Sequence, residues 1–173
     1  HMLSRSASLR MATSTSRRDT LACIPWREID SRIAAWDELA ARASEPNPFL
    51  ESWYLLPSLR ALDPEGAIAI LCFEAQGRLA GLLPLYRQRR YYRYPLPNLA
   101  GWVHANCFLG APLVARGQET AFWRALLAWS DAKPGFGLFF HLHQLPLSGP
   151  LFVALQAVLK HDGRKAAIVR REE

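Results

Sequence analysis

The chain has 173 residues and a formal net charge of +6; half of its residues are hydrophobic and 21% are charged. This length and composition are typical of one globular domain with its own hydrophobic core. No apolar run reaches the roughly 18 to 20 residues that a membrane-spanning helix needs, so we expect a cytoplasmic protein without a membrane span.

The N-terminal residues differ in composition from the rest of the chain. Residues 3–18 are rich in Ser, Thr, Ala and Arg and contain no acidic residue, and His1-Met2 has the form of a tag remnant. Organelle transit peptides share this composition, but a flexible arm is the simpler interpretation. We therefore expect a flexible arm over residues 1–20 and a single domain over residues 21–173.

The first half of the domain predicts a strand followed by two helices. Residues 21–29 are apolar and strand-like. The apolar residues that follow have helical spacing and predict a first helix capped by Asp30 or Ser31. A second helix is predicted to begin near Pro48, to contain Pro57 and to stop at residues 63–66. The apolar positions of the two helices are Ile33, Trp36, Leu39, Ala40 and Ala43, then Phe49, Trp53, Leu56, Leu59 and Leu62.

A hairpin comes next. Residues 67–74 and 79–86 are apolar strands that flank Gln76-Gly77, a dipeptide suited to a tight turn. Because proline cannot donate to a strand ladder, Pro84 predicts an edge or a bulge in the returning strand.

The following segment, YRQRRYYRYPLP, combines four arginines with four tyrosines between Tyr86 and Tyr94. Such a segment can stack bases and hold phosphates, or it can line a solvated sheet edge where charge prevents aggregation. We favour the solvated edge over nucleic-acid binding.

The second half predicts alternating strands and helices. Strands are expected at residues 107–114, 136–143 and 166–169. A helix over residues 118–132 carries an apolar stripe, and a second helix begins at residues 148–150 and ends at Gly163. The stripe consists of Phe122, Ala125, Leu126 and Trp129.

The three cysteines, Cys23, Cys72 and Cys107, occur in these apolar segments without the spacing of zinc or redox sites. We expect reduced, buried thiols, and a nucleophilic Cys107 is the alternative.

This order of elements predicts an α/β fold with a mixed, largely antiparallel central sheet flanked by about four helices, and it resembles the GNAT acyltransferase fold. The phrases WDELAARA, NPFLESWYLLPSLRAL, AILCFEAQGRLAGLLPLY and GWVHANCFLGAPLV, within residues 21–170, resemble the N-terminal half of the CelD/BcsL-type acetyltransferases linked to exopolysaccharide biosynthesis. Those proteins are FemAB-like and carry two GNAT-like domains in tandem.

The resemblance implies that acyl-CoA is bound mainly by a second domain, so that this chain holds no cofactor itself and is inactive in isolation. Its partners would be the missing C-terminal GNAT domain or a second copy of the chain, together with a small-molecule or saccharide acceptor. A GNAT coenzyme loop reads Gln/Arg-x-x-Gly-x-Gly/Ala. Here Arg116 and Ala121 match that pattern, whereas Glu119 replaces the central glycine and would repel a phosphate.

Acyl transfer needs a base for the acceptor and a donor for the oxyanion. The candidate bases are His104 and Glu51, and the candidate substrate-binding residues are Trp53, Tyr54, Asn106, His141 and His143. Three of them have a structural alternative: a loop hydrogen bond for His104, a first-turn carboxylate for Glu51 and a core position for Trp53. His104, His141 and His143 could approach one another, but no fourth ligand is recognisable, so we predict no metal site.

A second hypothesis is a non-catalytic, dimerising module that binds an anionic ligand through the basic-aromatic segment. An incomplete enzyme would expose the apolar surface that its second domain covers and would self-associate; we expect the isolated chain to dimerise in this way.

Overall fold

The computed structural model of the chain describes residues 19–88, 98–101, 112–132 and 149–163. The strands are β1 (Thr20–Pro25), β2 (Ile68–Ala75), β3 (Arg78–Gln88), β4 (Asn98–Gly101) and β5 (Leu113–Val114). The helices are α1 (Ile33–Ala41), α2 (Ser52–Leu62), α3 (Glu119–Asp131) and α4 (Pro150–His161), with short 3-10 turns η1 (Trp26–Glu28), η2 (Asp30–Arg32) and η3 (Pro48–Leu50).

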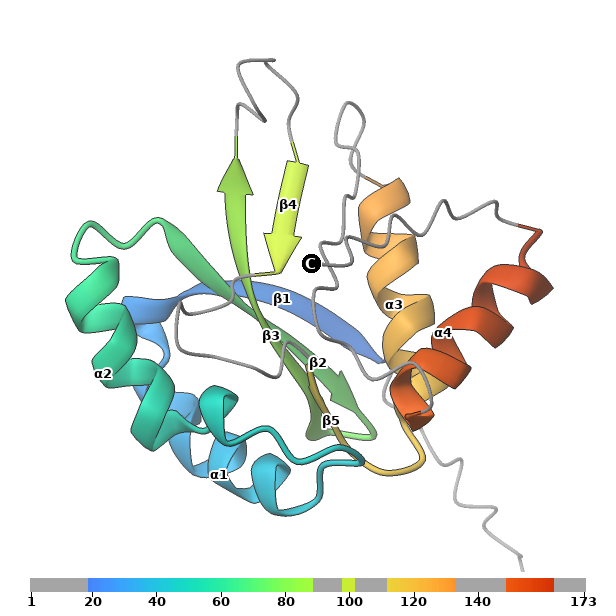
Figure 1. Cartoon of the computed structure of the whole chain (residues 1–173), viewed down its shortest axis with the longest axis horizontal. Coiled ribbons are helices and arrows are strands. Elements are labelled where there is room, and N and C mark those ends of the chain that lie inside the picture. The colour runs from blue at the N-terminus through green and yellow to red at the C-terminus, as the bar shows by residue number, and fades with distance from the viewer. Residues whose placement is uncertain (1–18, 89–97, 102–111, 133–148, 164–173) are drawn as a thin grey trace, which may run out of the picture.

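The strands form one sheet in the order β1-β2-β3-β4, and β5 pairs with a different part of β3. Every pairing among the described strands is antiparallel. Figure 1 shows α1 and α2 together on one side of the sheet and α3 and α4 together on the other. The prediction of an α/β fold with a largely antiparallel sheet and about four helices is confirmed.

The β2–β3 hairpin forms as the sequence predicts. Gln76 and Gly77 both have positive φ values, 55° and 73°, as a two-residue turn between twisted strands requires. Of the two features predicted at Pro84, an edge or a bulge, the bulge is not found there, because the register shifts between Phe73 and Glu74 instead. The pairings agree with the edge. Among the described residues, Pro84 pairs only with β2, because it lies between the part of β3 paired with β5 and the part paired with β4.

Two predicted boundaries were wrong. The returning strand, expected to end at residue 86, continues as β3 as far as Gln88, where β4 pairs with it. The helix expected from Pro48 is divided, because Glu51 is extended (φ −72°, ψ 147°) and separates η3 from α2. The predicted cap at Asp30 or Ser31 is also absent, since α1 begins after η2 without a side-chain cap.

The core is formed by the helices packing on the sheet. Trp36 of α1, Phe73 of β2, and Phe122 and Trp123 of α3 are fully buried. Gly81 makes this packing possible, because a Cβ atom there would meet the Phe122 ring at 2.5 Å. Cys72 is buried as expected, but Cys23 on the outer strand β1 is exposed, which corrects that prediction.

Within the described residues, no helix is long and apolar enough to cross a membrane. The flexible arm was predicted over residues 1–20: residues 1–18 lie outside the described residues, whereas Thr20 begins β1. The strands predicted at 136–143 and 166–169, and Cys107, also lie outside the described residues.

Candidate functional site

The turn between β5 and α3 is held by backbone contacts on both sides. Ala115 donates its N–H to the Ala80 carbonyl of β3 at 2.8 Å. On the other side, Ala43 bridges to Ala115, and Arg116 donates its N–H to the Arg42 carbonyl at 3.1 Å. The strand that leads into the turn is therefore fixed between β3 and the segment that follows α1.

The turn itself is open. Gly117 has φ +84°, and a Cβ atom built there would meet nothing within 4 Å. The Gln118 N–H is used by the Ala115 carbonyl at 3.0 Å, but the first amides of α3 have no acceptor within the helix, as at any helix start. Backbone N–H groups at a positive-φ glycine and a helix N-terminus favour anions.

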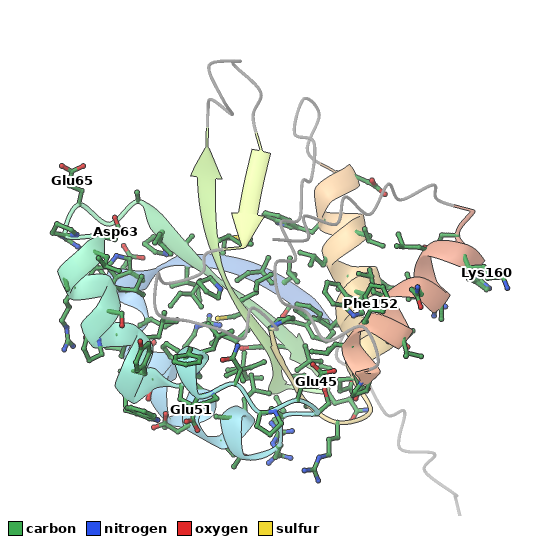
Figure 2. The ribbon with its side chains drawn as sticks, in the orientation of Figure 1. Glu45, Glu51, Asp63, Glu65, Phe152 and Lys160 are labelled. Atoms are coloured by element: carbon green, nitrogen blue, oxygen red, sulfur yellow. The ribbon has the colours of Figure 1, made fainter. Side chains whose placement is uncertain are left out.

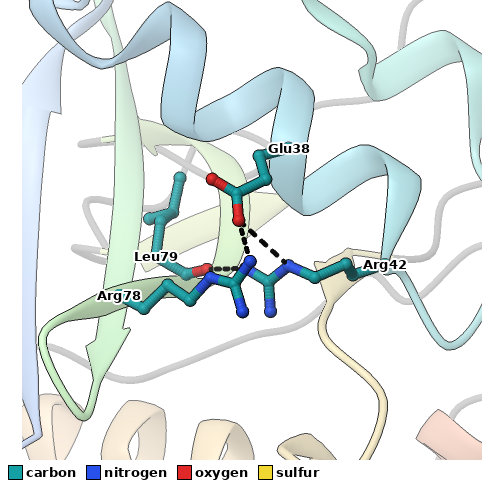
Figure 3. A network of polar contacts seen from close by, with 4 residues as sticks. All are labelled: Glu38, Arg42, Arg78 and Leu79. Atoms are coloured by element: carbon teal, nitrogen blue, oxygen red, sulfur yellow. Dashed lines mark hydrogen bonds and ion pairs between the residues drawn. The ribbon is translucent and has the colours of Figure 1, made fainter.

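Arginines gather beside this turn. Arg42 donates from Nη2 to the Leu79 carbonyl at 2.9 Å, and its Nε lies 3.9 Å from the Glu38 carboxylate. Arg78 forms an ion pair with the same Glu38 oxygen, as Figure 3 shows. One carboxylate is thus shared by two guanidinium groups, and the backbone of one of these arginines, Arg42, is hydrogen-bonded to the exposed Arg116.

Glu119 opposes this positive charge. It lies in the first turn of α3, where the helix dipole favours a carboxylate, and it is partly exposed.

A second group of polar and aromatic side chains lies at the start of α2. Glu51 accepts the indole N–H of Trp53 on Oε2 at 2.9 Å, and Trp53 is 65% exposed. Tyr54 makes edge-to-face contacts with Trp53 and Phe49, at centroid distances of 5.8 and 5.2 Å. Ser52 donates its hydroxyl to Asp37 Oδ1 of α1 at 2.5 Å, which ties the start of α2 to the preceding helix.

The structure brings Glu51, Trp53 and Tyr54 together at the surface. The core alternative for Trp53 was therefore wrong. His104, Asn106, His141 and His143 lie outside the described residues, as does the basic-aromatic segment apart from the backbone of Tyr86–Gln88. Among the described residues, no group of three or more His, Cys, Asp or Glu side chains is arranged to hold a metal ion.

Sequence reasoning missed the group formed by Glu38, Arg42 and Arg78. The i, i+4 spacing of Glu38 on α1 and Arg42, the residue that follows this helix, was a readable signal for an ion pair. No sequence signal placed Arg78 there, because its position depends on how the β2–β3 hairpin packs against α1.

Two solved structures are similar to this chain in the course of the backbone. One is AAC(6')-Iy in complex with the bisubstrate analog CoA-S-monomethyl-acetylneamine: it is 12% identical with a TM-score of 0.45, over 91% of this chain and 99% of that one. The other is an acetyltransferase of Trypanosoma brucei: it is 15% identical with a TM-score of 0.42, over 90% of this chain and 99% of that one. No protein-family model and no curated protein matches the chain. At these identities and scores, the two likenesses assign the chain to no family.

Proposed function

We propose that this chain is a domain of an acyl-CoA-dependent acyltransferase, in which the β5–α3 turn receives the phosphates of the coenzyme. The observation that carries the proposal is the turn at Arg116–Gln118, where Gly117 has φ +84° and leads directly into the N-terminus of α3. Such a turn presents backbone N–H groups to an anion at the positive end of a helix dipole.

The arginines beside the turn support the same ligand. Arg42 and Arg78 share a single carboxylate, Glu38, so their charge is only partly compensated. Glu119 acts in the opposite direction, because a carboxylate in the first turn of α3 occupies the position that favours a phosphate. We therefore propose weak coenzyme binding by this chain alone, in place of the expectation that it holds no cofactor, with most of the affinity supplied by a second domain.

The acceptor side is proposed to be formed by the start of α2. Acyl transfer moves a proton from an acceptor amine or hydroxyl to a base, while the acceptor atom attacks the thioester carbon and the thiolate leaves. Glu51 Oε2 is occupied by the Trp53 indole N–H, which leaves Oε1 to orient the acceptor or take its proton. His104 remains the other candidate base.

The finer assignment is an acceptor from exopolysaccharide or envelope biosynthesis, in the cytoplasm. It rests on the resemblance of residues 21–170 to the N-terminal half of the CelD/BcsL-type acetyltransferases. The exposed Trp53 is compatible with a saccharide, because an indole offers a large amphipathic surface.

Calorimetric titration of acetyl-CoA into the wild-type chain and three variants tests the donor site. Replacing the repelling carboxylate in Glu119→Gln should tighten binding about fivefold, the size of a helix-terminus charge effect. Arg116→Ala should weaken binding, and Arg60→Ala, an exposed arginine on α2, is the matched control. Pantetheine, which lacks the phosphates, should not bind.

The proposal fails if the chain with Glu119→Gln does not bind acetyl-CoA, or if pantetheine binds as well as acetyl-CoA. Equal affinities of the Arg116→Ala and Arg60→Ala variants would also place the coenzyme away from this turn.

A further inference from the structure

We propose that the start of α2 carries a binding site for an organic ammonium ion, formed by the indole face of Trp53 and the carboxylate of Glu51. The site is separate from the β5–α3 turn, but it uses Glu51 and Trp53, which the proposed function places on the acceptor side. Its test needs no coenzyme, so failure of coenzyme binding at the turn and failure of this proposal can be distinguished. Figure 2 shows Glu51 at the surface near the start of α2.

The Trp53 side chain is held in place and yet open to solvent. Its Nε1–H donates to Glu51 Oε2 at 2.9 Å, and its ring lies nearly perpendicular to that of Tyr54, with an interplanar angle of 83°. Nevertheless 65% of the residue remains exposed. A ring whose orientation is already fixed loses little conformational freedom when a ligand binds, and tryptophan is the aromatic side chain that attracts cations most strongly.

The hydrogen bond from the indole also increases the attraction for a cation. The carboxylate that accepts this bond lies at the edge of the same ring, so a cation over the indole face is close to a full negative charge. Only Glu51 Oε2 has a partner in the described part of the chain. Glu51 Oε1 is therefore available for an N–H donor or for direct contact with a quaternary ammonium group.

The charges around the site favour a cation over an anion. Neither Glu51 nor Asp37 forms an ion pair with a lysine or arginine among the described residues. Asp37 reaches the same helix start through its bond with Ser52. These two carboxylates outweigh the partial positive charge of about half a unit at the start of α2.

A neutral ligand of the same shape would gain neither the cation–π attraction nor the charge pairing. Both contributions act at a solvent-exposed position, where each is modest. We therefore expect millimolar affinity for a small ammonium compound, together with clear discrimination against an uncharged analogue.

The test compares choline with its uncharged isostere, in which a tert-butyl group replaces the trimethylammonium group. Each is titrated into the nitrogen-labelled chain while the indole N–H signals of its six tryptophans are followed by NMR. The Trp53 signal is identified by its loss in Trp53→Phe, and the remaining tryptophans report any general effect. We expect choline to shift the Trp53 signal saturably and the isostere to leave it unchanged.

Two matched variants test the contribution of the negative charge of Glu51 to choline binding. Glu51→Gln keeps an oxygen to accept the indole N–H but removes the negative charge, and it should weaken choline binding about fivefold. Glu65→Gln removes an exposed carboxylate beyond the other end of α2 and should have no effect. Equal shifts with the isostere, unchanged affinity in Glu51→Gln, or no saturable shift with choline would each overturn the proposal.

Discussion

Asp63 is a buried carboxylate that connects three parts of the chain. Its Oδ2 accepts the indole N–H of Trp26 at 2.9 Å and the backbone N–H of Ile68 at 2.8 Å, and its Oδ1 accepts the N–H of Ala67 at 2.9 Å. The residue is only 7% exposed. One side chain thus joins η1, the end of α2 and the start of β2, and all three donors depend on it.

We predict that Asp63→Ala lowers the free energy of unfolding by about 3 kcal/mol, because two buried N–H groups and one half-buried N–H group lose a charged acceptor. Asp63→Asn should also be destabilising, since its NH₂ group would face at least one N–H donor in either orientation. Urea denaturation measures both variants. Asp30→Ala, at an exposed position, should change stability by less than about 0.5 kcal/mol; a loss equal to that of Asp63→Ala would contradict this account.

Folding makes the thiol of Cys72 harder to deprotonate. Burial within β2 raises its pKa from 9.0 to about 11, and the nearby Arg32 offsets part of that shift. The unfolded chain therefore releases this proton at lower pH than the folded chain. Between pH 9 and 11 the unfolded state binds fewer protons, so stability falls as the pH rises through this range.

We predict that the wild-type chain loses about 2 kcal/mol more stability than Cys72→Ala between pH 9 and 11. Other groups titrate there in both proteins and cancel in the difference. Urea denaturation at a series of pH values measures this difference in stability. If the stability of the two proteins falls equally with pH, the pKa of the Cys72 thiol is not raised by folding. In the native chain, the exposed Cys23 should react with a thiol reagent well before Cys72 does.

Helix α4 is attached to the rest of the structure through its first turn. Leu151 donates its N–H to Glu45 Oε1 at 3.2 Å, and its carbonyl accepts the indole N–H of Trp123 at 2.8 Å. Glu45 can approach only because residue 149 is glycine: a Cβ atom there would lie 2.8 Å from the Glu45 Cδ. The start of α4 is therefore fixed by a side chain from the segment after α1 and another from α3.

We predict that Gly149→Ala destabilises the chain by about 1 to 3 kcal/mol through this clash, and that it increases amide hydrogen exchange in α4. Its φ is −79°, so alanine causes no backbone strain. In a double-mutant cycle, Glu45→Ala should remove most of the cost of Gly149→Ala, because the clash then has no partner.

The matched control is Gly163→Ala at the other end of α4. Gly163 has φ +66° and open space around it. Gly163→Ala should therefore lower the free energy of unfolding by about 1 kcal/mol, because alanine is strained in this left-handed backbone conformation. That cost should add to the cost of Glu45→Ala. If Gly163→Ala couples to Glu45→Ala as strongly as Gly149→Ala does, the contact between Glu45 and residue 149 is not the cause of the destabilisation by Gly149→Ala.

The elements that local sequence could predict are those whose signal lies within one segment. The stripe of α3 and the Gln76-Gly77 turn contain their own periodicity or backbone preference, and both occur where expected. Strand β4 was missed because its four residues carry no alternation and are defined by pairing with Leu85–Gln88. The division between η3 and α2 depends on the conformation of one residue, Glu51, which an apolar pattern cannot show.

The residues of the candidate site also fall into those that the sequence could identify and those that depend on tertiary packing. The Glu51–Tyr54 group is a run of neighbours and could be named from the sequence, although helical spacing wrongly favoured a buried Trp53. The approach of Arg42 and Arg78 to one carboxylate could not be predicted, because the hairpin and α1 are brought together only by tertiary packing.

For the whole molecule, charge separates the two proposed sites. The chain has a net charge of +6, which attracts an anionic coenzyme and repels a cation at long range. The arginines lie beside the β5–α3 turn, whereas the carboxylates Glu51 and Asp37 lie at the start of α2. Two ligands of opposite charge should therefore respond differently to salt.

We predict that acetyl-CoA binding weakens strongly as salt rises from about 0.1 to about 1 M, because the screening length falls from about 10 to about 3 Å. Choline binding should change less: added salt weakens its local attraction to Glu51 but also weakens its repulsion by the net positive charge. Titrations of both ligands at several salt concentrations make the comparison in one protein. If acetyl-CoA affinity does not depend on salt, its binding is not governed by phosphates at Arg116–Gln118, and the charge separation proposed for the molecule does not determine where its ligands bind.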